Sequence, residues 1–189
     1  MENRKEFFSS ALKSGLIVGA VSILLFLLMY VADVKPVGFI MPIITMLISI
    51  FVLMVVLVIL FKKYRTSNGG FISFGDAFLY LFLALLISSL VSSVFSWLFI
   101  HFVEPEYYKK IMEAQKVFME NYLQGKMTED KINETLNAID EQAKNMSSFK
   151  SLAKNFAWSA VLYGIVALIA GAILKKKPDM FDADKGGVI

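Results

Sequence analysis

Residues 65–78, RTSNGGFISFGDAF, hold the densest group of glycines and side chains that could bind a phosphate. Gly70 and Gly75 have the G-x-x-x-x-G spacing of a P-loop, whose backbone N–H groups cradle a phosphate. A P-loop continues with Lys and then Ser or Thr, but Asp76 and Ala77 occupy these two positions here. A carboxylate at the first of them would repel a triphosphate, and an apolar helical run precedes the segment where a strand is required. The segment therefore does not predict a nucleotide site.

The same segment is typical of a helix start. Ser73 can cap a helix N-terminus, and Asp76 three residues later completes a capping-box-like S-x-x-D pattern. The helix would begin next to a basic stretch, and helix N-termini favour anions. The alternative hypothesis is therefore a lipid-phosphate site, with candidate contacts Lys62, Lys63, Arg65 and Ser73. The later cluster Lys175, Lys176 and Lys177 would also attract anionic lipid.

Catalytic chemistry has little support elsewhere in the chain. His101 is the only histidine, and the chain has no cysteine, which excludes disulfides and thiolate metal sites. Glu104 and Glu106 lie close to His101, but one His with two Glu is a poor metal set, and Pro105 separates the two glutamates. We therefore predict no catalytic residue, no metal and no cofactor. An enzyme that uses His101, Glu104 and Glu106 on lipid-linked substrates is a distant alternative.

The elements that would position these residues are membrane helices. Hydrophobic residues make up 57% of the 189-residue chain and charged residues 19%, which is too apolar for an ordinary soluble domain. Four runs without charge, of 19, 25, 27 and 20 residues, span 14–32, 37–61, 77–103 and 155–174. A helix needs about 20 apolar residues to cross the hydrocarbon core. We therefore predict an all-α membrane protein with transmembrane helices at about 14–33, 37–61, 74–103 and 154–174.

A cleaved signal peptide is the rival interpretation of the first run. That run is longer than the usual apolar region of about 7–15 residues, and no small-x-small cleavage pattern follows it. We therefore expect a retained helix.

Charge at the ends of the helices predicts the orientation. Four spans place both termini on one side, where ten basic residues stand against six acidic ones. On the other side, Lys35 and seven lysines between Glu104 and Leu152 stand against ten acidic residues. Basic residues in short flanks mark the cytoplasmic side, so we expect both termini and the tail 175–189 in the cytoplasm. No nucleic-acid-binding motif accompanies the basic residues, so we expect no nucleic-acid partner.

The polar segment 105–150 predicts two amphipathic helices on the opposite, extracytoplasmic side. Pro105 fits the first turn of a helix, and Gly125 is a natural stop. Thr128 can cap a second helix, whose apolar positions Ile132, Leu136, Ile139, Ala143 and Met146 repeat every three or four residues. The short link favours an antiparallel hairpin between the third and fourth membrane helices. It could stand as a stalk or lie on the membrane, and its candidate contact residues are Tyr108, Phe118 and Leu136.

Small residues form rows within the membrane runs, and such rows mark helix–helix interfaces. The row residues are Gly15, Gly19, Ser88, Ser92, Ser96, Gly164 and Gly171. They could pack inside the bundle, or they could dock a second membrane protein or another copy of this chain. No run contains Asp, Glu, Lys or Arg, which disfavours a proton or ion carrier and leaves a neutral oligomeric pore open.

Three segments resemble the bacterial inner-membrane family known as domain of unknown function 4199. They are the turn Tyr64-Arg65 with Gly70–Phe78, the stretch Phe102–Tyr108, and the hairpin turn Gln124–Ile132, where Lys126 separates the family's Gly and Met. The resemblance implies four spans in a gram-negative inner membrane and transfers no catalytic residue. We predict a non-enzymatic accessory or scaffolding subunit, embedded in the lipid bilayer, with a membrane-protein partner or self-association. The alternative is an oligomeric lipid- or solute-handling channel or carrier.

Overall fold

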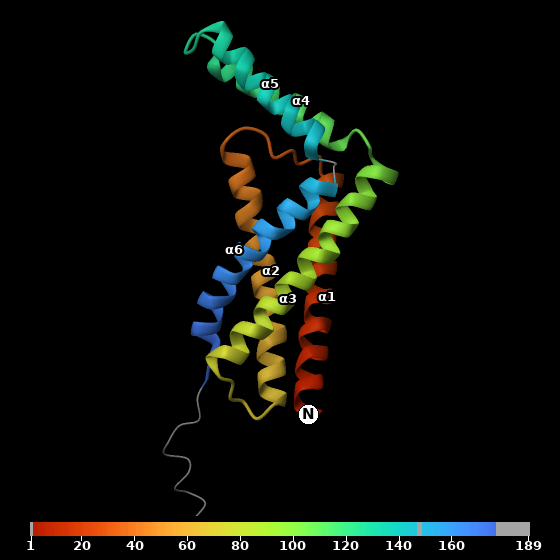
Figure 1. Ribbon diagram of the computed structural model, residues 1–189, viewed down its shortest axis with the longest axis vertical. Coiled ribbons are helices and arrows are strands. Elements are labelled where there is room, and N and C mark those ends of the chain that lie inside the picture. The colour runs from red at the N-terminus through yellow and green to blue at the C-terminus, as the bar shows by residue number, and fades with distance from the viewer. Residues whose placement is uncertain (1, 147–148, 177–189) are drawn as a thin grey trace, which may run out of the picture.

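Long apolar helices dominate the fold. The computed structural model describes residues 2–146 and 149–176 (Figure 1). Within this part of the chain the elements are α1 (Glu2–Val31), α2 (Ile40–Ser67), α3 (Phe74–Leu98), the π-helical turn η1 (Phe99–Val103), α4 (Tyr107–Leu123), α5 (Glu129–Met146) and α6 (Phe149–Leu174). Four segments are long and apolar enough to cross a membrane: Arg4–Val31, Ile40–Ser67, Phe74–Val103 and Ala153–Leu174. These helices confirm the prediction of an all-α protein with four membrane spans.

The helices extend beyond the charge-free runs. α1 begins at Glu2, well before the expected start at residue 14, and α2 continues to Ser67. Charged side chains such as Lys and Glu are good helix formers, so the absence of charge delimits the apolar part of a helix and not its ends. Lys62 and Lys63 consequently belong to α2. The predicted tail lies outside the described residues beyond Lys176.

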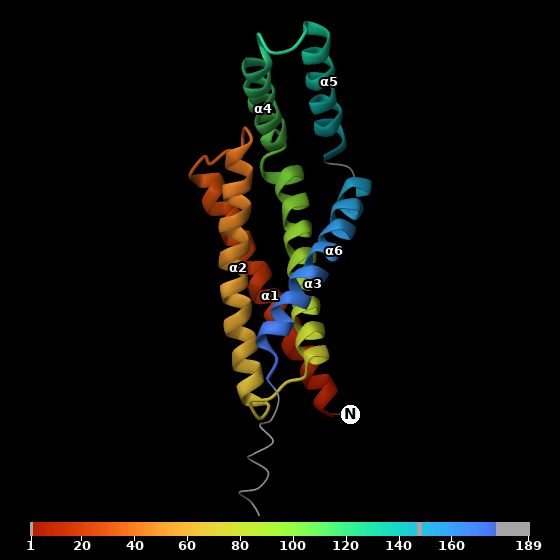
Figure 2. The same ribbon diagram turned by 90° about the vertical axis from the view of Figure 1, so that its left-hand side faces the viewer.

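α3 is the central helix of the bundle. Its most extensive contacts are with α1 and α6, and Figure 2 shows α6 crossing it obliquely. A Cβ added at Gly15 of α1 would lie 2.7 Å from the carbonyl oxygen of Ala84 on α3. A Cβ at Gly171 of α6 would lie 3.1 Å from the backbone nitrogen of Phe78 on α3. Glycine at these two positions therefore allows both neighbouring helices to approach α3 closely.

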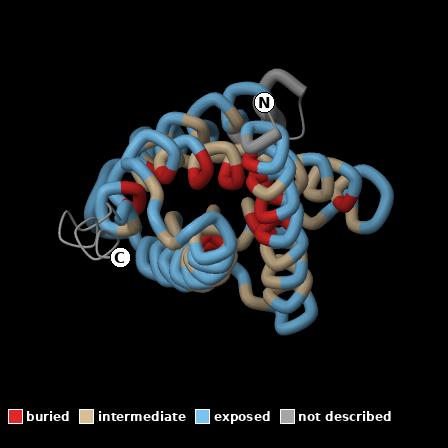
Figure 3. The backbone as a smooth tube through the Cα atoms, turned by 90° about the horizontal axis from the view of Figure 1, so that it is seen from below, coloured by how far each residue is buried: buried red, intermediate tan, exposed pale blue. Residues whose placement is uncertain are grey.

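The buried residues gather on the sides of the helices that face one another (Figure 3). At one end of the bundle, here called the terminal end, lie the start of α1, the turn between α2 and α3, and the end of α6 (Figure 1). Tyr80 is fully buried there and stacks on Tyr64, with ring centroids 4.7 Å apart. Phe7 and Phe61 meet the Tyr80 ring edge-on. Aromatic packing therefore joins the first three membrane helices.

α4 and α5 form an antiparallel pair at the opposite end of the bundle, here called the hairpin end (Figure 2). Lys116 of α4 forms an ion pair with Asp140 of α5. Gly125 in the connecting turn has a φ of 76°, a left-handed conformation that favours glycine. Pro105 lies in the turn before α4 and not in its first turn, because Glu106 is the N-cap residue. The side chains at positions 143 and 146 of the expected α5 seam lie outside the described part of the chain.

Candidate functional site

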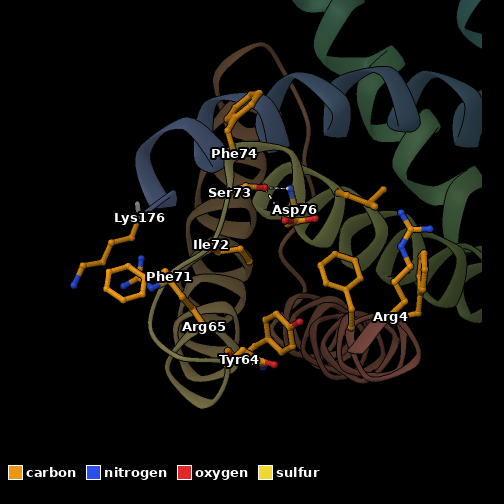
Figure 4. Close-up of a pocket in the computed structure, with 13 residues that line it drawn as sticks. Arg4, Tyr64, Arg65, Phe71, Ile72, Ser73, Phe74, Asp76 and Lys176 are labelled. Atoms are coloured by element: carbon orange, nitrogen blue, oxygen red, sulfur yellow. Dashed lines mark hydrogen bonds between the residues drawn. The ribbon is translucent and has the colours of Figure 1, made fainter. Parts of the chain in front are cut away.

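A cavity of about 700 Å³ opens at the terminal end of the bundle (Figure 4). Its walls come from the start of α1, the end of α2, the loop 71–73, the first turns of α3 and the residue after α6's last turn. Three cationic side chains line it, Arg4, Arg65 and Lys176, together with one carboxylate, Asp76. Most of the remaining lining side chains are aromatic or aliphatic. The cavity therefore combines positive charge with an apolar surface.

The Arg65 side chain and the Lys176 backbone are held at the end of α6. The Arg65 guanidinium donates from Nη1 to the carbonyl oxygen of Leu174, at 2.8 Å. This oxygen is one of the carbonyls that a helix C-terminus leaves without an intrahelical partner. Ile72 and Lys176 exchange backbone hydrogen bonds of 2.9 and 3.1 Å, which ties the loop before α3 to the end of α6. Arg65 and Lys176 consequently lie on the same side of the cavity, and Arg4 lies on the opposite side (Figure 4).

Ser73 and Asp76 form the predicted helix cap. The Ser73 hydroxyl oxygen accepts a hydrogen bond from the Asp76 backbone N–H at 3.1 Å and donates to Asp76 Oδ2 at 2.6 Å (Figure 4). Ser73 is thereby confirmed as the N-cap residue, and the Asp76 carboxylate accepts from the Ser73 hydroxyl, where a capping box would use the backbone N–H of residue 73. These bonds occupy the Ser73 hydroxyl and the Asp76 backbone N–H, which are the donors that could otherwise bind an anion. The hydrogen bond from Ser73 also offsets part of the negative charge of the Asp76 carboxylate.

The lysines proposed from the sequence lie elsewhere. Lys62 and Lys63 are exposed on the last turns of α2 and do not line the cavity, whereas Arg65 and Ser73 do. Arg4 was not among the candidate contacts, although it lines the cavity from α1. Its contribution depends on the start of α1 lying beside the end of α2, and no local pattern around Arg4 indicates that arrangement.

The residues considered for catalysis have separate partners at the hairpin end. Glu104 accepts from Lys110 Nζ at 3.0 Å and from the Tyr30 hydroxyl at 3.1 Å, and these bonds lower the pKa of the Glu104 carboxyl. Glu106 pairs with Lys109 at 3.1 Å. His101 donates from Nδ1 to the carbonyl oxygen of Trp97, at 2.9 Å. Among the described residues, no group of three or more His, Cys, Asp or Glu side chains could hold a metal ion.

Comparison with protein families gives one match over most of the chain. The profile of a family described as "Protein of unknown function (DUF4199)" matches residues 13–176. The chain belongs to the DUF4199 family. No curated protein and no solved structure matched it significantly. The matched region of this DUF4199 protein begins in α1 and ends at Lys176, so it contains every described wall of the cavity except the first turns of α1.

Most of the residues in the predicted small-residue rows of this DUF4199 protein lie inside the bundle. Gly15 and Gly19 face α3, where Cβ atoms at these positions would meet Ile87 at 2.7 Å and Val91 at 3.0 Å. Ser88 is buried, and the Ser92 hydroxyl donates to Ser22 Oγ on α1 at 3.0 Å. Gly171 also contacts α3, whereas Gly164 is looser and Ser96 is half-buried. These rows therefore serve mainly as packing surfaces between α3 and its neighbours.

The three candidate residues of the hairpin lie in different surroundings. Phe118 packs edge-on against Phe39, with ring centroids 5.4 Å apart. Tyr108 is half-buried, and its burial raises the pKa of its hydroxyl. Leu136 is half-buried on α5. Of the three, Phe118 thus links the hairpin to Phe39, the residue before α2.

Proposed function

We propose that this protein is a non-enzymatic accessory or scaffolding subunit of an assembly in the bacterial inner membrane. The chain would cross the membrane four times, with both termini in the cytoplasm and the α4–α5 hairpin on the extracytoplasmic side. The observation that carries the proposal is the attachment of the hairpin to the exposed first half of α2. A partner with a transmembrane helix and an extracytoplasmic part would contact both elements.

The hairpin is anchored at the start of α2 by a backbone bond and an aromatic cluster. The Gly38 N–H donates to Gln115 Oε1 at 2.8 Å. The Phe39 ring lies 5.4 Å from Phe118 and 5.1 Å from Tyr122, both in edge-to-face geometry. Aromatic pairs of this kind contribute about 0.5–1.5 kcal/mol each beyond the area they bury. These contacts hold the hairpin at a fixed position above α2.

The first half of α2 is poorly covered by the rest of the chain. Ile40 and Phe51 are each 70% exposed, and most apolar side chains between them are exposed as well. Thr45 and Ser49, four residues apart, form a small hydroxyl-bearing row of the kind found at interfaces between membrane helices. Lipid alone could cover the apolar side chains. The continuity of this surface with the anchored hairpin is what favours a protein partner over lipid.

The orientation and the non-enzymatic assignment have separate support. The basic residues Arg4, Lys5, Lys13, Lys62, Lys63 and Arg65 all belong to helix segments near the terminal end. An excess of Lys and Arg in short flanks favours the cytoplasmic side. At the other end, His101, Glu104 and Glu106 each bond to a different group, so they do not act as a unit.

In-cell photocrosslinking tests the proposed surface. A photoreactive amino acid would replace Phe51 of α2 or Val117 of the hairpin, both exposed, and Leu57, which is fully buried, would serve as the matched control. We expect positions 51 and 117 to give adducts with the same membrane protein, identified by mass spectrometry, and position 57 to give none. Adducts with lipid only, with unrelated proteins at the two sites, or with a second copy of this chain would contradict the proposal. Solute flux or lipid scrambling by the purified protein in liposomes would favour a channel or carrier instead.

A further inference from the structure

We infer that the cavity at the terminal end binds the phosphate-bearing headgroup of an anionic phospholipid. The phosphate would lie between Arg4 on one side and Arg65 with Lys176 on the other, and the acyl chains would leave past Phe8 and Leu79 into the bilayer. This inference concerns a different surface from the proposed partner contact. The two proposals can therefore be tested independently of each other.

The charge of the lining side chains favours an anion. Three cations and one carboxylate line the cavity, so the lining carries a net charge of two positive units (3 − 1 = 2). The carboxylate, Asp76, already accepts a hydrogen bond from Ser73 at 2.6 Å. The Arg65 guanidinium has five N–H donors, and one on Nη1 bonds to the Leu174 carbonyl oxygen. Because the guanidinium is planar, this bond also orients the other donors, which can bind a ligand. Arginine and lysine donors form strong charge-assisted hydrogen bonds with phosphate oxygens.

The three cations line one cavity because of the tertiary structure. Arg4, Arg65 and Lys176 come from three segments that are far apart in the sequence. The Ile72–Lys176 backbone pair and the Arg65–Leu174 bond fix one side of the cavity. The Arg65 side chain, which is already held, therefore loses less conformational freedom on binding than a free surface side chain would lose.

The rim of the cavity indicates a lipid and not a water-soluble phosphate. Phe8 and Leu79 line the cavity and are 49% and 37% exposed, and Leu12 continues the exposed face of α1 one turn beyond Phe8. On the other side, Lys176 Nζ lies 5.7 Å from the centroid of the Phe71 ring. Aromatic and lysine side chains are typical of the depth at which headgroups lie. A phospholipid requires an apolar opening through which its acyl chains reach the bilayer, whereas a free phosphate does not.

The size of the cavity fits a headgroup. Its volume of about 700 Å³ lies within the range of about 300–1,000 Å³ that is usual for small-molecule sites. Phe7 and Tyr64 also line it and belong to the aromatic cluster around Tyr80. The headgroup would therefore rest against the rigid aromatic packing of the terminal end.

Native mass spectrometry of the purified full chain in detergent tests the inference by titration with phosphatidylglycerol and with zwitterionic phosphatidylcholine. The test variant is the double substitution Arg4→Gln with Lys176→Gln, and both side chains are exposed. The matched control is Lys62→Gln with Lys63→Gln, which removes the same charge from the same end but outside the cavity. Arg65 is left unchanged because it also binds the end of α6. Unfolding temperatures without added lipid verify that both variants fold.

We expect the wild type to prefer phosphatidylglycerol to phosphatidylcholine. The test variant removes two cations, so it should lose at least about tenfold in affinity for phosphatidylglycerol, which is the cost of a single charge-assisted hydrogen bond, and the control should retain wild-type affinity. An equal loss in both variants would show general surface attraction and overturn the inference. Displacement of bound phosphatidylglycerol by millimolar inorganic phosphate or glycerol phosphate would identify a water-soluble anion as the ligand, and would overturn the assignment to lipid.

Discussion

The hydroxyl groups of Tyr80 on α3 and Ser14 on α1 lie 2.7 Å apart in the buried interior of the terminal end. Ser10 Oγ lies 3.1 Å from the same Tyr80 hydroxyl, so one phenol joins two successive turns of α1. The tyrosine ring itself is fully buried among Phe7, Phe61 and Tyr64. A single side chain therefore contributes apolar packing and a polar link between the two most extensively packed helices.

Replacement of Tyr80 by Phe should destabilise the bundle by about 1 kcal/mol, because it removes the partner of a buried serine hydroxyl and keeps the ring. Ser14→Ala should cost a comparable amount, and the double variant should cost less than the sum of the two. Unfolding of the detergent-solubilised protein with a denaturing surfactant would measure all three. Strict additivity of the two losses would show that the hydroxyl pair contributes no coupling.

Alanine at Gly15 should be far more damaging than alanine at Gly164. The new Cβ at Gly15 would lie 2.7 Å from the Ala84 carbonyl oxygen and 2.7 Å from Ile87 Cβ, so α1 and α3 must move apart. At Gly164 the nearest atom is Cε2 of Phe82 at 3.8 Å, an ordinary contact. We expect a loss of about 1–3 kcal/mol for Gly15→Ala, as for other overpacked sites, and little change for Gly164→Ala. The same surfactant titration compares them, and equal effects would contradict the close α1–α3 approach.

The attachment of α4 to the bundle should weaken in acid. Bonds from Lys110 and Tyr30 lower the pKa of Glu104 in the folded protein, so the unfolded chain takes up this proton at higher pH than the folded chain. The stabilisation is therefore complete above the ordinary glutamate pKa of about 4.3 and is lost as pH falls below it. The same pair raises the pKa of Lys110, so at the alkaline limit the contribution is lost only as pH rises above the ordinary lysine pKa of about 10.4.

Hydrogen exchange of the backbone amides in the first turns of α4 would follow this change. Protection should fall as the pH drops below about 4.3, the ordinary glutamate pKa, by more than the intrinsic exchange rates predict, and Glu104→Gln should remove most of that dependence. An unchanged pH dependence in the Glu104→Gln protein would assign it to another group.

Cysteine labelling should report the proposed orientation directly, because the chain has no native cysteine. Lys131→Cys on the hairpin and Ser67→Cys at the end of α2 are both at exposed positions. In cells with a permeabilised outer membrane, an impermeant maleimide should label Lys131→Cys at once and Ser67→Cys only after lysis. Labelling in the reverse order would invert the orientation.

Local patterns in the sequence predicted the features that depend on neighbouring residues. The charge-free runs predicted four spans because the hydrocarbon core excludes charge over a fixed thickness. Ser73 and Asp76 lie three residues apart, so their reciprocal bonds follow from the geometry of one helical turn. The π-helical turn at Phe99–Val103 escaped prediction because one added residue per turn leaves no periodic trace in a short apolar stretch.

Features that depend on which helices are neighbours could not be predicted in this way. Gly15 and Gly19 indicated a close helix contact. They did not indicate that the neighbouring helix would be α3 instead of α2. The cavity was missed for the same reason, since Arg4 and Lys176 meet Arg65 only after the bundle has assembled. Lys62 and Lys63 seemed equivalent to Arg65 because proximity in sequence does not specify the direction of a side chain.

The preference of α1 for α3 bears on how the chain is made. During synthesis α1 and α2 emerge first, yet α1 makes its most extensive contact with α3, and the residues that fit against Gly15 and Gly19 lie beyond residue 80. The glycine face of α1 must therefore contact lipid or the insertion machinery until α3 has been inserted. Assembly of this bundle is consequently a process in which α1 receives its main neighbour only after α2 has been made.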